Sequence, residues 1–358
     1  MWGDISIAFL LAFITAFVIT PHTIKLAKKL GAIDKPEKRR INENPIPRLG
    51  GLAVIAGFLV STIYLIIVMT IEKTFNPFGP EEYHIKLIGL LIGIIILGIF
   101  AFIDDIKALP AIIKLLGQVI AAIVVVSLGI RIDNINIPFL EQTLNINNEI
   151  YIYILSVAWI IVITNAINLI DGLDGLSSGI TLISCFSLII VFTMNSSPII
   201  AIILITALAG AIVGFLPYNF NPAKTFIGDT GAQFLGFALA VISILGIAKT
   251  YTLIVLISPL IILALPICDT IFAIIRRIIK GKSIKAIFAP DTGHLHHKLM
   301  KKGYTQKQAV LILYGISACF GMFAIILLES GIWKALSFAI MFIAVISIGY
   351  KDIFKVKK

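Results

Sequence analysis

Two adjacent carboxylates, Asp104 and Asp105, follow one long apolar run of this chain and shortly precede Pro110, where another run begins. Neighbouring carboxylates repel each other unless a cation lies between them. Proteins hold Mg²⁺ through one or two carboxylates, and phosphate oxygens of a substrate complete its coordination shell. The pair could equally be two solvated charges at the end of a helix. Its chemistry therefore depends on which other polar groups meet it in space.

A second group of polar side chains recurs every three residues near the end of another apolar run: Asn165, Asn168, Asp171 and Asp174. Residues three apart lie on one side of a helix, so a helical end would present these groups together. The two Asp-Gly pairs here are also typical of turns, but a turn does not explain a polar stripe. We interpret Asp171 and Asp174 as candidate catalytic residues, Asp171 also as a metal ligand, and Asn168 as a substrate-binding residue.

A third segment, residues 219–231, leads directly into an apolar run and contains Lys224, Asp229 and Thr230. Asp229 and Thr230 could simply be the N-cap of the helix that follows. The start of a helix also presents free N–H groups and the positive end of the helix dipole, which suit phosphate. We therefore expect Asp229 to hold a metal ion that bridges a phosphate, and Lys224 to bind substrate.

Three of the five histidines lie within four residues, at His294, His296 and His297. Imidazole is a good zinc ligand, but no cysteine stands nearby, and H-x-H-H is not a common spacing for structural zinc. Beside basic residues, histidines can instead donate hydrogen bonds to phosphate, and one could titrate near neutrality. We predict that all three bind substrate.

Two further residues are candidates for substrate contacts. Asp269, near the end of an apolar run, is either a packing carboxylate paired with Arg276 or a substrate-binding residue. Arg48 can pair with a phosphate through two N–H groups. Gly50 and Gly51, which follow it closely, permit close approach of the backbone. The alternative for this segment is a proline-rich turn at the interface.

The elements that position these groups are too apolar for a soluble protein. The mean hydropathy is +1.05, and 13% of residues are charged, against about 25% in soluble domains. Crossing a bilayer takes roughly 20 apolar residues in a helix, and lipid cannot satisfy free backbone groups. We predict an all-α, polytopic membrane protein with one integral-membrane domain over residues 1–358. The predicted spans are residues 4–24, 50–71, 85–103, 111–130, 150–168, 176–194, 198–216, 231–248, 251–274, 308–328 and 332–350.

Lysine and arginine residues indicate the orientation. With the N-terminus outside and the C-terminus inside, 24 of the 29 Lys and Arg residues fall on the cytoplasmic side, as the positive-inside rule requires. The net charge of +10 then needs no nucleic-acid partner, and no basic segment is interleaved with stacking aromatics. Outside, residues 132–149 could form a short β-hairpin. The predicted cytoplasmic active-site loops are residues 25–49, 104–110, 169–175, 217–230 and 275–307.

Together these motifs resemble those of the polyprenyl-phosphate N-acetylhexosamine-1-phosphate transferases of glycosyltransferase family 4, in the family's order and over almost the whole chain. The motifs are PRLGG at 47–51, DDIK at 104–107 followed by Lys114 and Gln118, NLIDGLDGL at 168–176, NPAKTFIGDTG at 221–231, and HLHH at 294–297. Ala232 departs from the family pattern, which has a small hydroxyl residue there. HLHH favours the branch that transfers N-acetylglucosamine 1-phosphate to undecaprenyl phosphate, since the phospho-N-acetylmuramoyl-pentapeptide branch typically has three consecutive histidines.

The resemblance implies a homo-oligomer, often a dimer, of ten or eleven transmembrane helices in the cell membrane, with a groove that faces the cytoplasm. The implied reaction moves a sugar 1-phosphate from a UDP-sugar to polyprenyl phosphate, releases UMP and requires Mg²⁺, with Mn²⁺ as an alternative ion. We expect Asp104 or Asp105 to take or orient the proton of the lipid phosphate, and Arg48 and the histidines to hold phosphate oxygens. The lipid phosphate attacks either directly or through a covalent aspartyl intermediate.

Other functions remain as alternatives. Within the family, the chain could make lipid I from UDP-MurNAc-pentapeptide. A transporter or flippase would instead have ionisable residues near the middle of the bilayer and broken helices in paired positions, whereas the acidic groups here lie at predicted cytoplasmic helix ends. A structural scaffold gives no reason for clustered carboxylates and histidines.

Overall fold

The computed structural model describes residues 2–35, 44–132, 134–137, 142–145, 148–247, 253–283, 287, 291 and 293–353, without the side chains of 134–137, 142–145, 247, 253–256 and 344–353. Some predictions fall outside these ranges. They concern Lys38, Arg39 and Arg40 of the predicted loop 25–49, Pro138 of the predicted hairpin, and parts of the predicted loop 275–307.

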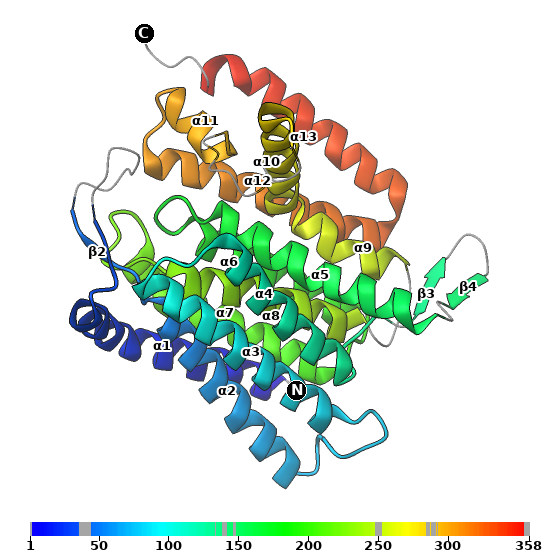
Figure 1. Cartoon of the computed structure of the whole chain (residues 1–358). Helices are drawn as coiled ribbons and strands as arrows, with labels where there is room; N and C mark the ends of the chain where they lie inside the picture. Colours follow the sequence, from blue (N-terminus) through cyan, green and yellow to red (C-terminus); the bar gives the residue numbers. More distant parts are fainter. Residues whose placement is uncertain are drawn as a thin grey trace.

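Helices make up most of the described chain (Figure 1). They are α1 Trp2–Leu30, α2 Gly51–Ile71, α3 Tyr83–Ile106, α4 Ala111–Ser127, α5 Glu149–Ile170, α6 Leu176–Met194, α7 Ile199–Asn219, α8 Gly228–Ile247, α9 Leu253–Ile262, α10 Ala264–Gly281, α11 Leu295–Lys301, α12 Gln306–Ser330 and α13 Ile332–Ile353. Two antiparallel strand pairs join them: β1 Ile33–Asp34 with β2 Ile46–Pro47, and β3 Asn134–Ile137 with β4 Gln142–Asn145. The all-α prediction and the hairpin within residues 132–149 are both confirmed.

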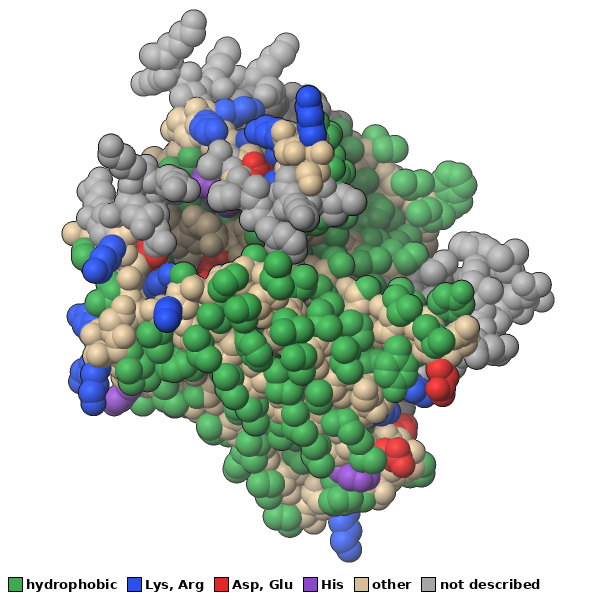
Figure 2. All heavy atoms as spheres, viewed as in Figure 1, with side chains coloured by type: hydrophobic (Ala, Val, Ile, Leu, Met, Phe, Trp, Pro, Cys, Tyr) green, Lys and Arg blue, Asp and Glu red, His purple; other side chains and the backbone are tan. Residues whose placement is uncertain are grey.

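The outer surface of the helices is apolar. Large side chains such as Ile14, Ile67, Ile95 and Ile154 are more than half exposed, and Figure 2 shows hydrophobic side chains over the middle of one face. Within the described ranges, eight helices are long and apolar enough to cross a membrane: α1, α2, α3, α5, α6, α7, α8 and α12. Helix α4 and the stretch Ile332–Ile343 of α13 are shorter apolar helices. The chain is therefore a multi-span membrane protein, as predicted.

One predicted span, residues 251–274, is wrong as a continuous helix. It divides at Leu263 into α9 and α10. The physical reason is Pro266, which has no N–H to donate and whose ring would clash with the carbonyl of Ile262, four residues earlier. Proline is tolerated in the first turn of a helix, which is where α10 places it. As a result α10 leaves the direction of α9 and crosses α5 and α12 (Figure 1), both of which it contacts.

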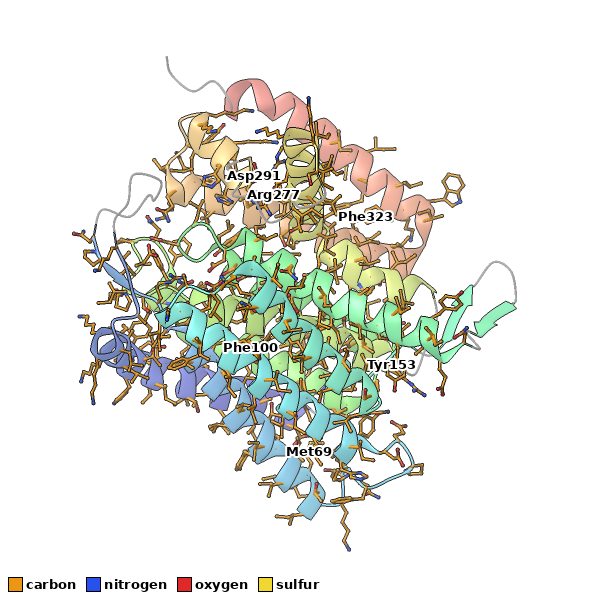
Figure 3. The ribbon with its side chains drawn as sticks, in the orientation of Figure 1. Met69, Phe100, Tyr153, Arg277, Asp291 and Phe323 are labelled. Atoms are coloured by element: carbon orange, nitrogen blue, oxygen red, sulfur yellow. The ribbon has the colours of Figure 1, made fainter. Side chains whose placement is uncertain are left out.

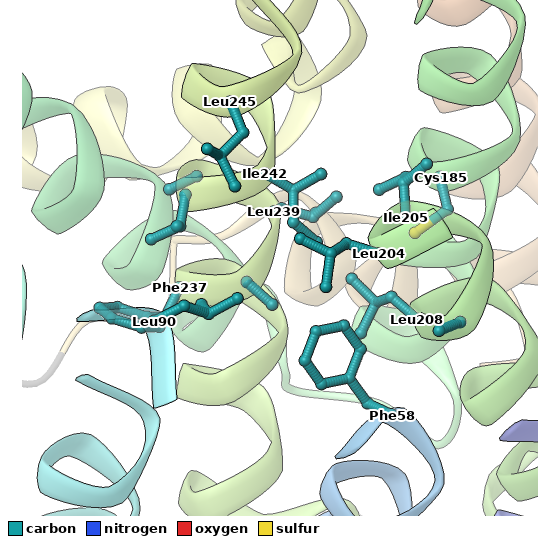
Figure 4. Close-up of a cluster of buried hydrophobic side chains, with 14 of the residues drawn as sticks. Phe58, Leu90, Cys185, Leu204, Ile205, Leu208, Phe237, Leu239, Ile242 and Leu245 are labelled. Carbon is teal, nitrogen blue, oxygen red and sulfur yellow. The ribbon is translucent and has the colours of Figure 1, made fainter. Parts of the chain in front are cut away.

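Helices α7 and α8 form the centre of the bundle and are buried along almost their whole length. Helices α1 and α2 pack against α7, while α3 and α5 pack against α8. In the core, Phe58 of α2 lies beside Leu204 and Leu208 of α7, and Phe237 of α8 lies beside Leu90 of α3 (Figure 4). All five side chains are almost completely inaccessible to solvent. This packing places the loops that follow α3, α5 and α7 around the first turn of α8.

The two ends of the bundle differ. The β1–β2 pair lies at one end and the β3–β4 hairpin at the opposite end (Figure 1). In Figure 2, most Lys and Arg side chains on the visible face gather toward the end with β2, where acidic side chains also appear in a hollow. The polar chemistry of the chain is therefore concentrated at one end.

Candidate active site

A polar cavity of about 730 Å³ opens at the end of the bundle that carries β2. Its walls come from β2, the start of α8, and the segments after α5 and α7. Seven predicted site residues line it: Arg48, Asn168, Asp171, Asp174, Lys224, Asp229 and His297. The other predicted residues, Asp104, Asp105, Asp269, His294 and His296, lie outside this lining. The structure thus brings most of the scattered motifs together and gives the rest different surroundings.

Arg48 is carried into the cavity by a ribbon of main-chain bonds between two distant segments. Phe226 N donates to Pro47 O at 2.8 Å, and Gly51 N donates to Ile227 O at 2.8 Å. The Thr225 hydroxyl also donates to Pro47 O, at 2.9 Å. A Cβ on Gly51 would overlap the backbone of Gly231 in α8. The predicted close approach of the backbone at Gly51 is confirmed, since the starts of α2 and α8 pack directly on each other.

Asp105 caps α8 from the end of α3. Its Oδ1 accepts from Asp229 N at 2.8 Å, and its Oδ2 accepts from Thr230 N at 2.9 Å and from the Thr230 hydroxyl at 2.6 Å. Gly228, with φ +70°, makes room for this carboxylate, because a Cβ there would lie 2.7 Å from Asp105 Oδ2. The cap therefore comes from another helix. The N–H groups of Asp229 and Thr230 therefore donate to Asp105 and are not available to phosphate, which restricts the predicted phosphate site at this helix start.

Two cations join the carboxylates at this point. Arg48 Nη2 lies 3.1 Å from Asp229 Oδ2 and 3.5 Å from Asp105 Oδ1, and Arg48 Nη1 lies 3.9 Å from Asp34 Oδ1. Lys114 of α4 is the second cation. Its Nζ lies 2.5 Å from Asp104 Oδ2 and 3.8 Å from Asp229 Oδ2. Both cations meet Asp229, so this carboxylate is the centre of the ion-pair network.

Lys114 and Asp34 were missed as site residues by sequence reasoning. Lys114 had a usable signal, because a lone cation inside a predicted span, 111–130, normally faces the interior of a bundle. Asp34 had none, since it lies in a polar loop among charged residues. It enters the site only because β1 pairs with β2, next to Arg48.

Asp104 and Asp105 are both almost completely buried. Asp104 Oδ1 accepts from Leu109 N at 2.7 Å and its Oδ2 pairs with Lys114. Each oxygen of the two carboxylates is thus already engaged by a described partner. Their contacts connect the end of α3 to α4 and α8, and so hold Lys114 and Asp229 in place.

Beneath the ion pairs, one helical turn further into the bundle, lies an amide network. Gln118 Nε2 donates to Gln233 Oε1 at 3.1 Å, and Asn165 Nδ2 donates to Gln118 Oε1 at 2.6 Å. Gln118 follows Lys114 by four residues, and Gln233 follows Asp229 by four. Buried amides that bond to one another are costly to separate, so the network fixes α4, α5 and α8 relative to one another below the cavity.

The loop after α5 supplies the other carboxylates. Asp171 Oδ1 accepts from the Ser177 hydroxyl at 2.6 Å. Asp174 Oδ2 accepts from Asn221 Nδ2 at 2.9 Å and from Ala223 N at 3.1 Å. Asp174 thereby connects its loop to the segment between α7 and α8, which carries Lys224. Asp171 keeps one wall of the cavity acidic.

The three histidines have different surroundings. His294 Nδ1 lies 2.7 Å from Asp269 Oδ2. Arg276 instead pairs with Asp291, at 2.7 Å. Figure 3 shows Asp291 close to Arg277, beside α10 and α11. The predicted alternative of an Asp269–Arg276 pair is therefore wrong. His296 is buried and only His297 lines the cavity.

Burial, together with the charges of neighbouring histidines, lowers the pKa of His296 to about 3. Burial, together with the charges of His294 and Lys301, lowers the pKa of His297. His296 is therefore neutral at physiological pH. Among the described residues, no group of three or more His, Cys, Asp or Glu side chains is arranged to hold a metal ion. The zinc alternative for H-x-H-H thus gains no support.

Comparison with known proteins agrees with this geometry. Residues 87–247 match the model of glycosyl transferase family 4. A probable undecaprenyl-phosphate N-acetylglucosaminyl 1-phosphate transferase of Bacillus subtilis is 39% identical over 346 residues, which cover 96% of this chain and 89% of the relative. The chain belongs to glycosyl transferase family 4.

Other members of the family are less similar. The decaprenyl-phosphate N-acetylglucosaminephosphotransferase of Mycobacterium tuberculosis is 31% identical, over 87% of this chain and 79% of the relative. A phospho-N-acetylmuramoyl-pentapeptide-transferase of Halalkalibacterium halodurans is 28% identical, over 89% of this chain and 95% of the relative. The resemblance inferred from the motifs is confirmed, and the branch with N-acetylglucosamine in its names is the more similar one.

The raised pKa of Asp171 predicts that the effect of this residue on stability depends on pH. Burial raises that pKa from its ordinary value of 3.8 to about 7, with the charges of Asp105 and Asp174 adding to the effect and the Ser177 hydrogen bond and Arg48 opposing it. A carboxyl group whose pKa is higher in the folded state destabilises that state as the pH rises from about 4 to about 7. In EDTA, Asp171→Asn should therefore raise the apparent melting temperature most at pH 8 and less at pH 5.

The control for this measurement is Glu149→Gln, at the opposite end of α5, where Glu149 is exposed. This variant should show the same small change at both pH values. An equal effect of Asp171→Asn at pH 5 and pH 8 would contradict a raised pKa of Asp171.

Proposed function

We propose that this protein transfers N-acetylglucosamine 1-phosphate from a UDP-sugar to polyprenyl phosphate, in the branch represented by its Bacillus subtilis and Mycobacterium tuberculosis relatives. The observation that carries the proposal is the position of the cavity. It lies at the ends of apolar helices and collects Asp171, Asp229, Arg48 and Lys224 on its walls. Such a site can take a lipid phosphate from the membrane surface and a nucleotide from water.

A divalent cation fits the donors of this cavity. Six carboxylates, those of Asp34, Asp104, Asp105, Asp171, Asp174 and Asp229, stand in or beside it against the cations Arg48, Lys114 and Lys224. Pyrophosphate would be repelled by the excess negative charge, so its binding requires a counter-ion. Asp171 and Asp229 would hold Mg²⁺, or Mn²⁺ in its place, with substrate phosphates in the remaining positions. When bound, the ion would neutralise charge on the pyrophosphate and polarise the phosphorus under attack.

The residues of the chain bind and orient the reactants. Lys224 and His297 face the cavity and are available to the sugar nucleotide, as is the Asn168 amide. Arg48 is held by three carboxylates, which fix its guanidinium at the edge of the cavity, where it can bind phosphate oxygens once a divalent cation offsets the negative charge of the site. An oxygen of the lipid phosphate attacks the β-phosphorus in line, and the bond from that phosphorus to the bridging oxygen breaks. UMP leaves with the bridging oxygen, so catalysis consists mainly of positioning and electrostatic stabilisation.

Asp104 and Asp105 have a positioning role in this scheme. Their oxygens are engaged by Lys114, Leu109, Asp229 and Thr230, so neither is free to accept the proton of the lipid phosphate. The second ionisation of a phosphate monoester has a pKa of about 6, and the attacking oxygen is therefore largely ionised at neutral pH. A separate general base is not needed.

The orientation of the site is part of the proposal. The cavity lies at the end of the bundle with β2, where the visible Lys and Arg side chains gather (Figure 2). Positive charge is retained on the cytoplasmic side of bacterial membranes. We place the cavity on the cytoplasmic face of the cell membrane, which is also where nucleotide sugars are made available.

The test measures UMP release and lipid product by purified protein given UDP-GlcNAc and undecaprenyl phosphate. Transfer is expected, loss of transfer in EDTA, and recovery with Mg²⁺ or Mn²⁺. A parallel reaction with UDP-MurNAc-pentapeptide tests the lipid I alternative. If UMP is released with UDP-MurNAc-pentapeptide but not with UDP-GlcNAc, the proposed donor is wrong and the protein makes lipid I. If no donor gives UMP, the result favours the transporter or flippase alternative. Exchange of labelled UMP into UDP-GlcNAc without lipid would favour a covalent aspartyl intermediate over direct attack.

A further inference from the structure

His296 is a buried imidazole that lies against a backbone. Its side chain is 2% exposed, and its Nδ1 has no hydrogen-bond partner in the described structure. The ring covers Gly172, next to Asp171. A Cβ on Gly172 would lie 2.6 Å from His296 Cε1 and still closer to Nε2. The imidazole thus occupies the space that any side chain at position 172 would need.

Backbone conformation does not explain the glycine at position 172. Its φ is not in the left-handed region that Gly175, three residues later, adopts at +75°. An alanine could therefore take the same backbone angles. What excludes it is the imidazole of His296.

Asp269 of α10 holds this histidine in place through its neighbours. One Asp269 oxygen lies 2.7 Å from His294 Nδ1, and the other accepts from Leu295 N at 3.0 Å. The His294 and His296 rings are nearly parallel, with centroids 5.8 Å apart. Asp269 and His294 are themselves buried. The Asp269 carboxylate on α10 therefore fixes the start of α11, and with it the distance that the His296 ring extends toward Gly172.

Apolar side chains of α11 pack against a cluster that includes residues of the loop that carries Asp171 and Asp174. Leu295 and Leu299 pack against a cluster of buried residues that contains Ile170, Leu173 and Leu176. The loop has apolar contacts on both flanks of Gly172, and His296 presses on the glycine between them.

We propose that His296 is a positioning residue, a wedge whose ring lies on Gly172 and fixes the Asp171 turn, and that the Asp269–His294 pair sets how far this ring reaches. Its consequence for catalysis rests on the proposed function. His296 and Asp269 then act through Asp171 and do not touch substrate. Of the three histidines, His297 alone faces the cavity.

The steric part of the proposal is tested by thermal unfolding of the purified full chain, without substrate. Gly172→Ala should lower the apparent melting temperature, and adding His296→Ala should bring it back toward that of His296→Ala alone. The matched control is Gly315→Ala in α12, where nothing lies within 4 Å of the added Cβ; His296→Ala should have the same effect in that background as in the wild type. Additive effects of Gly172→Ala and His296→Ala would overturn the wedge.

The catalytic part is tested with a space-filling variant. His296→Leu fills the volume without an acid, a base or a metal ligand, and it should keep transfer within about fivefold of the wild type, while His296→Ala lowers kcat at least about tenfold, as expected of a misplaced active-site loop. KM for UDP-GlcNAc should change less than kcat. If His296→Leu is as inactive as His296→Ala, the imidazole has chemistry of its own and the positioning role is wrong.

The two proposals fail separately. If wild-type protein transfers no sugar phosphate but the melting temperatures of the Gly172 and His296 variants are coupled, the proposed function is wrong and the wedge stands. If transfer is observed and the melting temperatures are additive, the function stands and the wedge is rejected.

Discussion

Replacing Asp229 with asparagine should lower transfer of the sugar phosphate by at least about a thousandfold. Among the carboxylates that the structure describes, Asp229 alone meets both Arg48, at 3.1 Å, and Lys114, at 3.8 Å, and it also lines the cavity. Asparagine keeps the shape of the side chain but removes the charge that would bind a divalent cation. The measurement is kcat for UMP release over a range of Mg²⁺ concentrations.

The same variant should fold normally. The site holds more carboxylates than cations, so removing one negative charge relieves repulsion in the metal-free state. In EDTA, the apparent melting temperature of Asp229→Asn should equal or exceed that of the wild type. Asp291→Asn, which removes a carboxylate outside the cavity lining, is the control and should keep transfer near the wild-type level. Near-normal turnover of purified Asp229→Asn would reject the metal role of Asp229.

Asp105→Asn should cost both stability and activity. The Asp105 side chain is inaccessible to solvent and accepts from Asp229 N, Thr230 N and the Thr230 hydroxyl. An amide can accept with one end only, so its NH₂ group would face a donor at the start of α8. We expect the free energy of unfolding to fall by about 2–4 kcal/mol. Transfer should fall as well, because α8 carries Asp229.

A graded control is available for this second prediction. Thr230→Val removes the hydroxyl that donates to Asp105 Oδ2 at 2.6 Å and leaves the two backbone bonds in place. It should lower the free energy of unfolding by about 1 kcal/mol. Thermal unfolding in detergent, without nucleotide or metal, measures both variants. An Asp105→Asn protein as stable as the wild type would mean that this carboxylate does not hold the start of α8.

The contrast between Asp105 and Asp229 describes the general organisation of the site. Both residues belong to short polar motifs, and both are contacted by Arg48. Asp105 is enclosed by donors and holds the cavity wall together, whereas Asp229 is partly exposed to the cavity. The same division separates His296, which is buried, from His297, which lines the cavity. Identical residue types therefore have different roles because of their access to the cavity.

Hydropathy alone determined that this chain is a polytopic helical membrane protein. The inference succeeded because an apolar run of about 20 residues has few other stable environments. The order of the polar motifs also indicated the family and most of the cavity lining, since all of them except the histidine motif stand next to an apolar run. Pro266 could have predicted the break at Leu263. An average of hydropathy does not reveal it, because a proline inside an apolar segment changes the hydrogen bonding of the helix and hardly changes its mean hydropathy.

Only the tertiary structure decided which polar groups touch the cavity. Asp105 became a cap because the end of α3 meets the start of α8, more than a hundred residues later. Contacts between different elements likewise bring Lys114 into the ion-pair network and pair Asp269 with His294. Local sequence sets which helix a side chain belongs to, but burial, hydrogen-bond partners and pKa depend on the helices packed against it, and those contacts form between segments far apart in the chain.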